Sequence, residues 1–319
     1  MSFKKGVATL EKPLLNPYVA LAIGVVSIST SAIMVKFSSA PSGVMAFYRL
    51  FFSVLLMSPV FLLKYVSELR LITKRDWLFT GISGVFLSFH FILWFESLQY
   101  TSVASSTVLV TLQPLFAFVG TYFFFKETLS RKAILSGVLA VLGSVIISWG
   151  DFKISGTALF GDMLALSACA LITAYLLFGQ TVRKRLSLIT YTFVVYSIST
   201  ITLLVYVVIK GEAFVGYASS EWVYFFLLAL IPNLLGHSFI NWAIKWLSTS
   251  TISMGILFEP VGATILAFYF LEESVILTQI IGGTIVIFGI TLFILDDRKF
   301  KLKEKIKDPL PAMKKTPLT

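Results

Sequence analysis

Long apolar segments constrain the fold of this chain more than any other feature of its sequence. A helix needs about 20 consecutive apolar residues to cross a bilayer, and it satisfies its own backbone amides, as hydrocarbon requires. Barrel strands would be shorter and would alternate apolar with polar residues. Segments long enough to span as helices lie at 17–37, 44–64, 77–98, 102–125, 131–149, 157–180, 188–209, 221–244, 249–270 and 274–295. The sequence therefore predicts an all-α integral membrane protein with ten transmembrane helices.

Composition argues against a soluble protein and against a nucleic-acid-binding one. Charged residues make up 13% of the chain, whereas soluble domains are roughly a quarter charged. The net charge of +10 reflects topology, because eight of the 26 basic residues follow Asp297 and most others lie in short loops. The one cysteine, Cys169, cannot form a disulfide within the chain. We expect the partners to be the lipid bilayer, a small-molecule substrate and a proton or other coupling ion, with the oligomeric state open.

The distribution of Lys and Arg predicts the orientation of the spans. With alternating spans, 22 of the 26 basic residues fall on one side, and the other side has Lys36, Lys153 and Lys210. Basic loops mark the cytoplasmic side, so we expect a cytoplasmic N-terminal tail (1–16) and a basic cytoplasmic C-terminal tail (296–319). The first apolar segment lacks a small-residue cleavage site, which predicts that it is retained as a helix.

An internal repeat relates the two halves of the chain. A shift of 146 residues aligns 102–143 with 248–289 without a gap, and it carries the other spans of the first half onto those of the second. Each five-helix unit (17–149 and 157–295) has an odd number of spans, so we expect the two units to be inverted in the membrane. Inverted repeats with a site near their pseudo-two-fold axis recur in secondary transporters. The aligned identities are Ser102, Pro114, Ala117, Phe124, Glu127, Ile134, Gly137 and Gly143 with Ser248, Pro260, Ala263, Phe270, Glu273, Ile280, Gly283 and Gly289.

The repeated segments also resemble a known family, the drug/metabolite transporter superfamily, and specifically its ten-helix members made of two EamA-type units. The resemblance covers essentially 17–295 and rests on Pro114 and Pro260, the stretches FFFKETLSRKAILSG and YFLEESVILTQIIGG, Arg49 in FYRLFFS, and the Phe258-Glu259-Pro260 step. Lys126 and Glu272 stand where the family usually has a glycine. The resemblance implies an exporter or exchanger of small metabolites, often amino acids, in a bacterial inner (plasma) membrane, driven by an ion or solute gradient. It does not choose among amino acids, sugar phosphates, nucleotide-sugars and drugs.

Glu259 is the first candidate for solute binding or coupling. It lies near the middle of the ninth span, and small residues one turn to either side, Gly255 and Gly262, leave room for a ligand or a close helix. Buried charges in a membrane are costly and are usually functional, which favours a carboxylate that binds substrate or a proton. The alternative is a structural carboxylate that holds two helices together. Its repeat mate Gln113 is neutral, so any charge chemistry is one-sided.

Two polar stripes are the next candidates. In the third span Ser83, His90, Trp94 and Ser97 share one helix face, and in the eighth span Asn233, His237 and Asn241 share another. We expect the stripes to line a central cavity, and Trp94 and Asn241 to face it together. The alternative is interhelical hydrogen bonding, of about 1 kcal/mol or less per bond. For each histidine taken alone, a structural role is the preferred interpretation.

The remaining candidates lie toward the ends of the spans. Tyr48, Arg49 and Lys36 are placed near the outer ends of the first two spans, where cations attract a carboxylate, although Lys36 is also positioned to snorkel. Tyr175 and Tyr196 are candidates for an aromatic lining.

We expect the loop acids Glu127 and Glu273 to stabilise helix N-termini instead.

Motifs for other functions are absent from the sequence. It contains no phosphate-binding G-x-x-x-x-G-K-[ST], no H-E-x-x-H and no C-x-x-C, so we expect no cofactor, no metal and no enzyme activity. The favoured function is secondary transport, with export of a small polar metabolite such as an amino acid. The alternatives are a transporter of another solute class and a membrane-embedded enzyme acting on lipid, which would need a catalytic cluster near one interface.

Overall fold

The protein is all-helical throughout the part that the computed structural model describes, residues 13–148, 156–272 and 275–307. The first half contains α1 (Pro17–Ser29), α2 (Ser31–Phe37), α3 (Ser42–Lys64), η1 (Val66–Leu71), α4 (Lys74–Tyr100), α5 (Val103–Thr111), α6 (Gln113–Phe125) and α7 (Arg131–Ser148). The second half contains α8 (Gly156–Arg183), α9 (Leu188–Lys210), α10 (Ser219–Leu228), η2 (Ala229–His237), α11 (Ser238–Ala243), α12 (Thr249–Ile256), α13 (Glu259–Phe270) and α14 (Leu277–Lys307).

Eight helical segments in these ranges are long and apolar enough to cross a membrane, and they coincide with the predicted spans one to four and six to nine. The fifth predicted span is the 18-residue helix α7, and the tenth lies in α14, whose apolar part, Ile280–Asp296, is shorter. The prediction of an all-helical membrane protein is therefore confirmed. The count of ten spans stays a prediction.

Four of the predicted spans are interrupted helices. Pro114 and Pro260 stand in the first turns of α6 and α13, and because proline lacks an amide hydrogen it ends the preceding helix, α5 or α12. The first span breaks at Thr30, whose hydroxyl donates to the Ser27 carbonyl oxygen at 2.7 Å, a bond that bends helices. The eighth span passes through the π-helical segment η2, which contains Pro232.

The two repeats are inverted, as the sequence predicts. Helix α5 packs on α13 and α6 packs on α12, so the fourth and ninth spans run antiparallel. Helices α7 and α14 cross in the same symmetric way: Gly143 lies against the backbone of Gly282, and its repeat mate Gly289 lies against the backbone of Ser136. Ser136 and Gly282 are themselves 146 residues apart. Glycine permits this close approach because a side chain at either position would meet backbone atoms within 3 Å.

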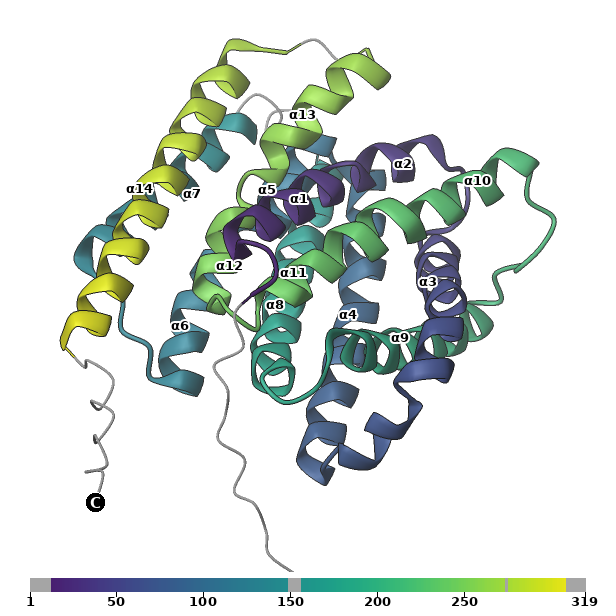
Figure 1. Ribbon diagram of the computed structural model, residues 1–319. Coiled ribbons are helices and arrows are strands. Elements are labelled where there is room, and N and C mark those ends of the chain that lie inside the picture. Colours follow the sequence, from purple (N-terminus) through teal and green to yellow (C-terminus); the bar gives the residue numbers. More distant parts are fainter. Residues whose placement is uncertain (1–12, 149–155, 273–274, 308–319) are drawn as a thin grey trace, which may run out of the picture.

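Helices α7 and α14 lie side by side at one edge of the bundle (Figure 1). They contact the other spans through α5, α12 and α13. The strongest packing elsewhere joins α4 to α8, while α1 lies on η2 and α11 in the pseudo-symmetric position. The centre of the bundle is thus formed by spans other than α7 and α14.

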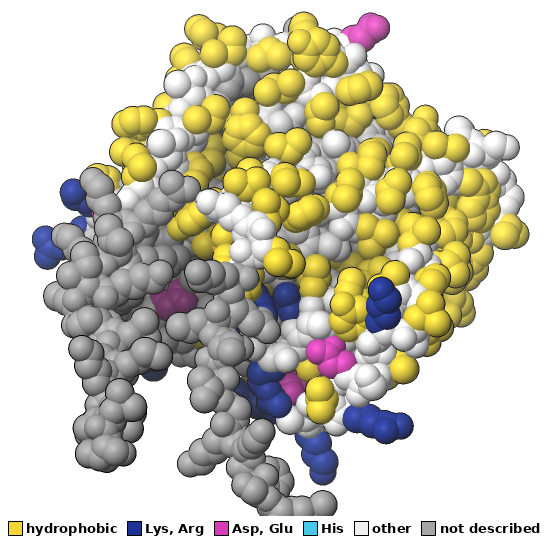
Figure 2. Space-filling model, viewed as in Figure 1, with side chains coloured by type: hydrophobic (Ala, Val, Ile, Leu, Met, Phe, Trp, Pro, Cys, Tyr) yellow, Lys and Arg dark blue, Asp and Glu magenta, His cyan; other side chains and the backbone are white. Residues whose placement is uncertain are grey.

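The surface of the bundle suits lipid. Large hydrophobic side chains such as Leu63, Leu135 and Ile209 are exposed, and soluble proteins rarely expose apolar patches of more than a few hundred Å². Figure 2 shows a face dominated by hydrophobic side chains, with the visible Lys and Arg side chains at its left edge and in its lower part. This separation agrees with a membrane-embedded protein that has one basic end.

The backbone at Lys126 and Glu272 yields a prediction about stability. Both residues have left-handed φ angles, 57° and 55°, at the two equivalent positions where glycine is usual in the family that the sequence resembles. We expect K126G and E272G each to raise the free energy of unfolding by about 1 kcal/mol, since an L-residue in this conformation costs roughly 1–2 kcal/mol. Thermal unfolding in detergent measures this. The control K132G, inside α7, should lower the stability by about 1 kcal/mol. A loss of stability in K126G and E272G would show that these turns carry no such strain.

Candidate functional site

A small cavity lies at the centre of the bundle, where both repeats contribute side chains. The space between these side chains is about 20 Å³, room for roughly one water molecule. Its lining comes from α1, α2, α3, α4, α5, α6, α8, η2, α11, α12 and α13, through Ile28, Ser31, Arg49, His90, Trp94, Val110, Gln113, Ile172, Leu176, His237, Ile240, Ile256 and Glu259.

The cavity lies on the pseudo-two-fold axis. Six of its lining residues form three pairs separated by 146 positions: Gln113 with Glu259, Trp94 with Ile240, and Val110 with Ile256. Only a site on the axis draws the same position from both repeats. This is where the sites of inverted-repeat transporters form.

Helix breaks surround this cavity. Ile28 and Ser31 flank the break at Thr30, and the lining residues Gln113 and Glu259 are the first residues of α6 and α13. The N-terminus of a helix carries partial positive charge and favours anions. At α13 the chain supplies its own carboxylate, whereas the equivalent end of α6 carries the neutral Gln113.

Arg49 is the cation of the site, and its side chain is fully buried. Its guanidinium donates to Ser31 Oγ at 2.8 Å and to Asn233 Oδ1 at 3.4 Å, and it lies 4.1 Å from the centre of the Phe91 ring. Asn233 in turn donates to Ser53 Oγ at 2.8 Å. These neutral partners hold the guanidinium in place but leave Nη2 without a hydrogen-bond acceptor among the described residues. A buried donor of this kind is costly unless something binds to it.

Glu259 is the acid of the site, with 5% of its surface exposed. Its carboxylate receives no hydrogen bond from the part of the chain that the structure describes, and Arg49 is the charged side chain that acts on it electrostatically. The two side chains do not form an ion pair within 4.0 Å of each other. The cavity thus contains an acidic and a basic side chain that do not pair with each other directly.

Trp94 and Gln113 add two more polar atoms to the cavity wall. The indole Nε1 of Trp94 and the amide Oε1 of Gln113 have no hydrogen-bond partner in the described ranges. His90 packs against Trp94, with ring centres 5.9 Å apart, and its Nδ1 lies 3.0 Å from the Ala168 carbonyl oxygen. A carbonyl only accepts, so Nδ1 carries the proton. The site therefore offers two donors, on Arg49 and Trp94, and two acceptors, on Gln113 and Glu259.

Comparisons with known proteins identify the family. The EamA-like transporter family matches residues 15–149 and 159–295 of the chain. The chain belongs to this family. It is 26% identical to the uncharacterized transporter YetK of Bacillus subtilis (strain 168) over 97% of this chain and 94% of YetK. It is 24% identical to an uncharacterized transporter of Clostridium kluyveri over 92% of this chain and 98% of that protein. A protein of known crystal structure shares the fold, with a TM-score of 0.69 and 19% sequence identity over 88% of this chain and 99% of that one.

These comparisons confirm the predicted family and the repeat, since the EamA-like match occurs once in each half. The family and the relatives are named as transporters rather than as enzymes. The protein is therefore an integral membrane transporter of the EamA-like family. Neither the substrate nor the site residues follow from the names.

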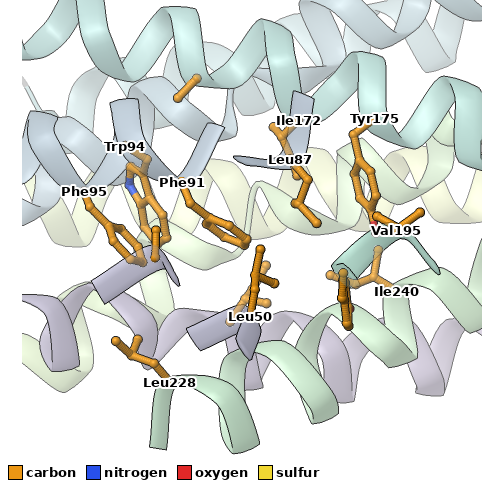
Figure 3. Close-up of a cluster of buried hydrophobic side chains, with 14 of the residues drawn as sticks. Leu50, Leu87, Phe91, Trp94, Phe95, Ile172, Tyr175, Val195, Leu228 and Ile240 are labelled. Atoms are coloured by element: carbon orange, nitrogen blue, oxygen red, sulfur yellow. The ribbon is translucent and has the colours of Figure 1, made fainter. Parts of the chain in front are cut away.

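Six predicted residues line the cavity of this EamA-like transporter, namely Arg49, His90, Trp94, Gln113, His237 and Glu259, whereas Tyr48, Tyr175 and Asn241 do not. Tyr175 and Asn241 contact each other beside the cavity, where the Asn241 amide donates to the Tyr175 hydroxyl at 2.5 Å. Tyr48 donates to the Phe214 carbonyl oxygen at 2.7 Å within an aromatic cluster. Figure 3 shows Trp94 and Phe91 at one side of the buried cluster and Tyr175 at the other. The expectation that Trp94 and Asn241 face one cavity is therefore not met.

Other predicted residues have local structural contacts. Lys36 donates to the Leu98 carbonyl oxygen at 2.6 Å. The loop residue Glu127 accepts a hydrogen bond from Gln180 at 3.2 Å, and α7 begins four residues later, at Arg131. Glu127 thus contacts α8 from the loop that precedes α7. Glu273 lies outside the described residues.

The sequence interpretation missed Ser31 and the apolar walls of the cavity. Ile240 could have been found because it stands 146 residues after Trp94. Val110 and Ile256 could have been found because each stands three residues before a candidate, Gln113 or Glu259. Ser31, which orients Arg49, has no signal of its own in the sequence. Its position depends on the break at Thr30, which no proline marks.

Proposed function

We propose that this EamA-like transporter exports a small zwitterionic metabolite, such as an amino acid, by alternating access. The observation that supports this most is that one buried cavity on the repeat axis holds a basic and an acidic side chain that are not paired with each other. A carboxylate of the solute accepts hydrogen bonds from Arg49 Nη2 and the Trp94 indole, and an ammonium donates to Glu259 and Gln113. A sugar phosphate would satisfy Arg49 but would leave Glu259 without a counter-charge. Export is the direction that the resemblance to metabolite exporters implies.

The size of the cavity supports a mechanism in which the lining moves. Small-molecule sites usually occupy about 300–1,000 Å³, and the space present is about 20 Å³, so a solute enters only when the walls separate. The helix breaks at Thr30, Leu112 and Leu257 lie next to the lining residues. Discontinuous helices of this kind let one repeat move against the other.

Coupling to a proton is the role we propose for Glu259. Its carboxylate can bind either the solute ammonium or a proton, but not both at once. Exchange between them links the solute to the proton gradient. Gln113, at the equivalent position of the other repeat, does not titrate, so one coupling group acts per transport cycle.

The alanine variant of Trp94 tests the cavity as the binding site. We expect W94A to raise the KM for transport roughly tenfold, the cost of one lost buried hydrogen bond to a charged group, with little change in protein abundance. The control is W77A, on the same helix but 44% exposed, which should leave KM unchanged. If W94A lowers the amount of folded protein and the remainder transports with normal KM, the cavity is not the binding site.

Orientation in the membrane is a separate proposal, with both termini cytoplasmic and the protein in a bacterial plasma membrane. A cysteine at Glu272 should react with an impermeant thiol reagent added to intact cells, whereas one at Lys184 should react only after the cells are opened. The buried Cys169 is replaced by serine in both variants. The reverse pattern of labelling would overturn the orientation.

A further inference from the structure

A second buried polar cluster lies beside the cavity and has no part in the proposed binding site. It contains Tyr175, Tyr191, Tyr196 and Asn241, from α8, α9 and α11, and none of these residues is more than 1% exposed. Tyrosine in membrane proteins is usually found at the lipid–water interfaces. Three tyrosines buried inside the bundle therefore call for another explanation.

The fold does not require polar residues at three of these four positions. Tyr191, Tyr196 and Asn241 correspond, at a separation of 146, to the other repeat's Met45, Leu50 and Phe95. These three are also fully buried and pack in the hydrophobic core. Since one half of the same architecture is built with apolar side chains at these positions, the polarity of the other half serves something other than packing.

The cluster extends from the cavity toward one end of the bundle. Tyr175 and Asn241 each lie one residue from a lining residue, Leu176 and Ile240. Further along α8, Arg183 donates to the Asn241 carbonyl oxygen at 2.9 Å and to that of Leu186. Polar groups thus follow one another from the cavity to the connector between α8 and α9.

At that connector a carboxylate joins the two repeats. Glu68 in η1 accepts hydrogen bonds from the Ser187 amide at 3.0 Å and from the hydroxyls of Ser187 and Thr190. Burial by itself raises the pKa of Glu68, but these hydrogen bonds outweigh that effect and hold the pKa below its ordinary value. The ionised carboxylate therefore ties the α3–α4 connector to the α8–α9 connector at the end that we assign to the cytoplasm.

From this arrangement we infer that the cluster is the cytoplasmic half of the solute path, and that the hydrogen bond between Asn241 and Tyr175 is its gate. The inference rests on the proposed alternating access. With the bond formed, the polar groups are sealed from the cytoplasm. When it breaks, the tyrosine hydroxyls and the Asn241 amide become accessible to water, and they offer hydrogen bonds to a polar solute between the cavity and the cytoplasm.

The gate is tested by the reactivity of a cysteine placed inside the cluster. In a C169S background, the reporter S83C replaces a fully buried serine whose hydroxyl lies 3.5 Å from the Tyr175 carbonyl oxygen. The control S88C replaces an equally buried serine on α4 that bonds to Gly84 and Ser199 instead. An impermeant methanethiosulfonate is added to inside-out vesicles. We expect Y175F to raise the labelling rate of S83C roughly five- to tenfold, as the loss of one hydrogen bond predicts, and to leave S88C unchanged.

A second variant guards against an artefact of folding. N241A removes the other partner of the same bond, so it should raise the rate for S83C by a similar factor, and the double variant should add little to either change. Unchanged S83C labelling, an equal rise in S88C, or faster labelling from right-side-out vesicles would each overturn the gate. None of these measurements uses a solute, so a negative result would overturn the gate without bearing on the proposed roles of Arg49 and Glu259. Those roles are tested separately by transport experiments.

Discussion

We expect E259Q to abolish gradient-driven accumulation of the solute and its dependence on pH, while the protein remains inserted and folded. Glutamine keeps the shape of the side chain and removes only its charge and its titration. Without the carboxylate, the cavity loses both the counter-charge for an ammonium group and the site for a proton. Passive exchange of solute across the membrane can persist, but the solute is no longer concentrated on one side of the membrane.

The measurement is accumulation in proteoliposomes with an imposed pH gradient, at several values of pH. The control is E96Q, which changes an acid on α4 that does not line the cavity and should accumulate solute as the native protein does. Native, pH-dependent accumulation by E259Q would assign Glu259 a structural role. The coupling group would then have to be sought elsewhere.

We expect R49M to lose transport but not stability. The hydrogen-bond partners of Arg49 are the neutral Ser31 and Asn233, so removing the cation leaves no partner carboxylate in direct contact. Removing one charge of a buried ion pair is strongly destabilising because it leaves its partner uncompensated, and Arg49 has no such partner in contact among the described residues. Removing the binding partner of a charged group usually costs about 2–5 kcal/mol of affinity, so solute binding should weaken by roughly 30-fold or more.

Measurements of solute binding and of thermal unfolding on R49M together test whether Arg49 serves binding rather than stability. R49K should also bind weakly, because lysine cannot reproduce the fixed geometry of the guanidinium. The control R185M removes a cation that is paired with Asp76 outside the cavity, and it should transport normally. An unfolded R49M protein, or one that binds solute with native affinity, would show that Arg49 serves structure rather than the solute.

Much of the fold could be predicted because the bilayer restricts what apolar segments do. The spans, the inverted repeat and the breaks before Pro114 and Pro260 all follow from segment length, a constant separation and proline chemistry. The break at Thr30 and the π-helical segment η2 were not predictable, because neither hydropathy nor spacing distinguishes them from a continuous helix. The left-handed turns at Lys126 and Glu272 could be inferred only by analogy with the glycine that stands there in the family.

The lining of the cavity was predicted in part, and a physical cause explains the residues that lie elsewhere. Spacing along a helix shows which residues share a face, as for His237 and Asn241, but not how deep each lies or which neighbour it meets. His237 ends the π-helical segment η2, whose wider turn changes which residues share a face, so His237 and Ile240 line the cavity while Asn241 bonds to Tyr175. For Glu259 and Gln113 the repeat predicts that the two residues lie close together, because equivalent positions near the pseudo-two-fold axis meet there.

The central claim is that the axial cavity carries a solute with two opposite charges. Its most direct test is competition against a labelled amino acid in proteoliposomes, with the same amino acid N-acetylated, the same amino acid as its amide, a sugar phosphate and a nucleotide-sugar as competitors. The predicted result is transport of the amino acid, with each derivative that lacks one charge competing roughly 30-fold less well and the phosphates competing weakly. Transport of a phosphate instead of the amino acid, or equal competition by the derivatives, would contradict the account.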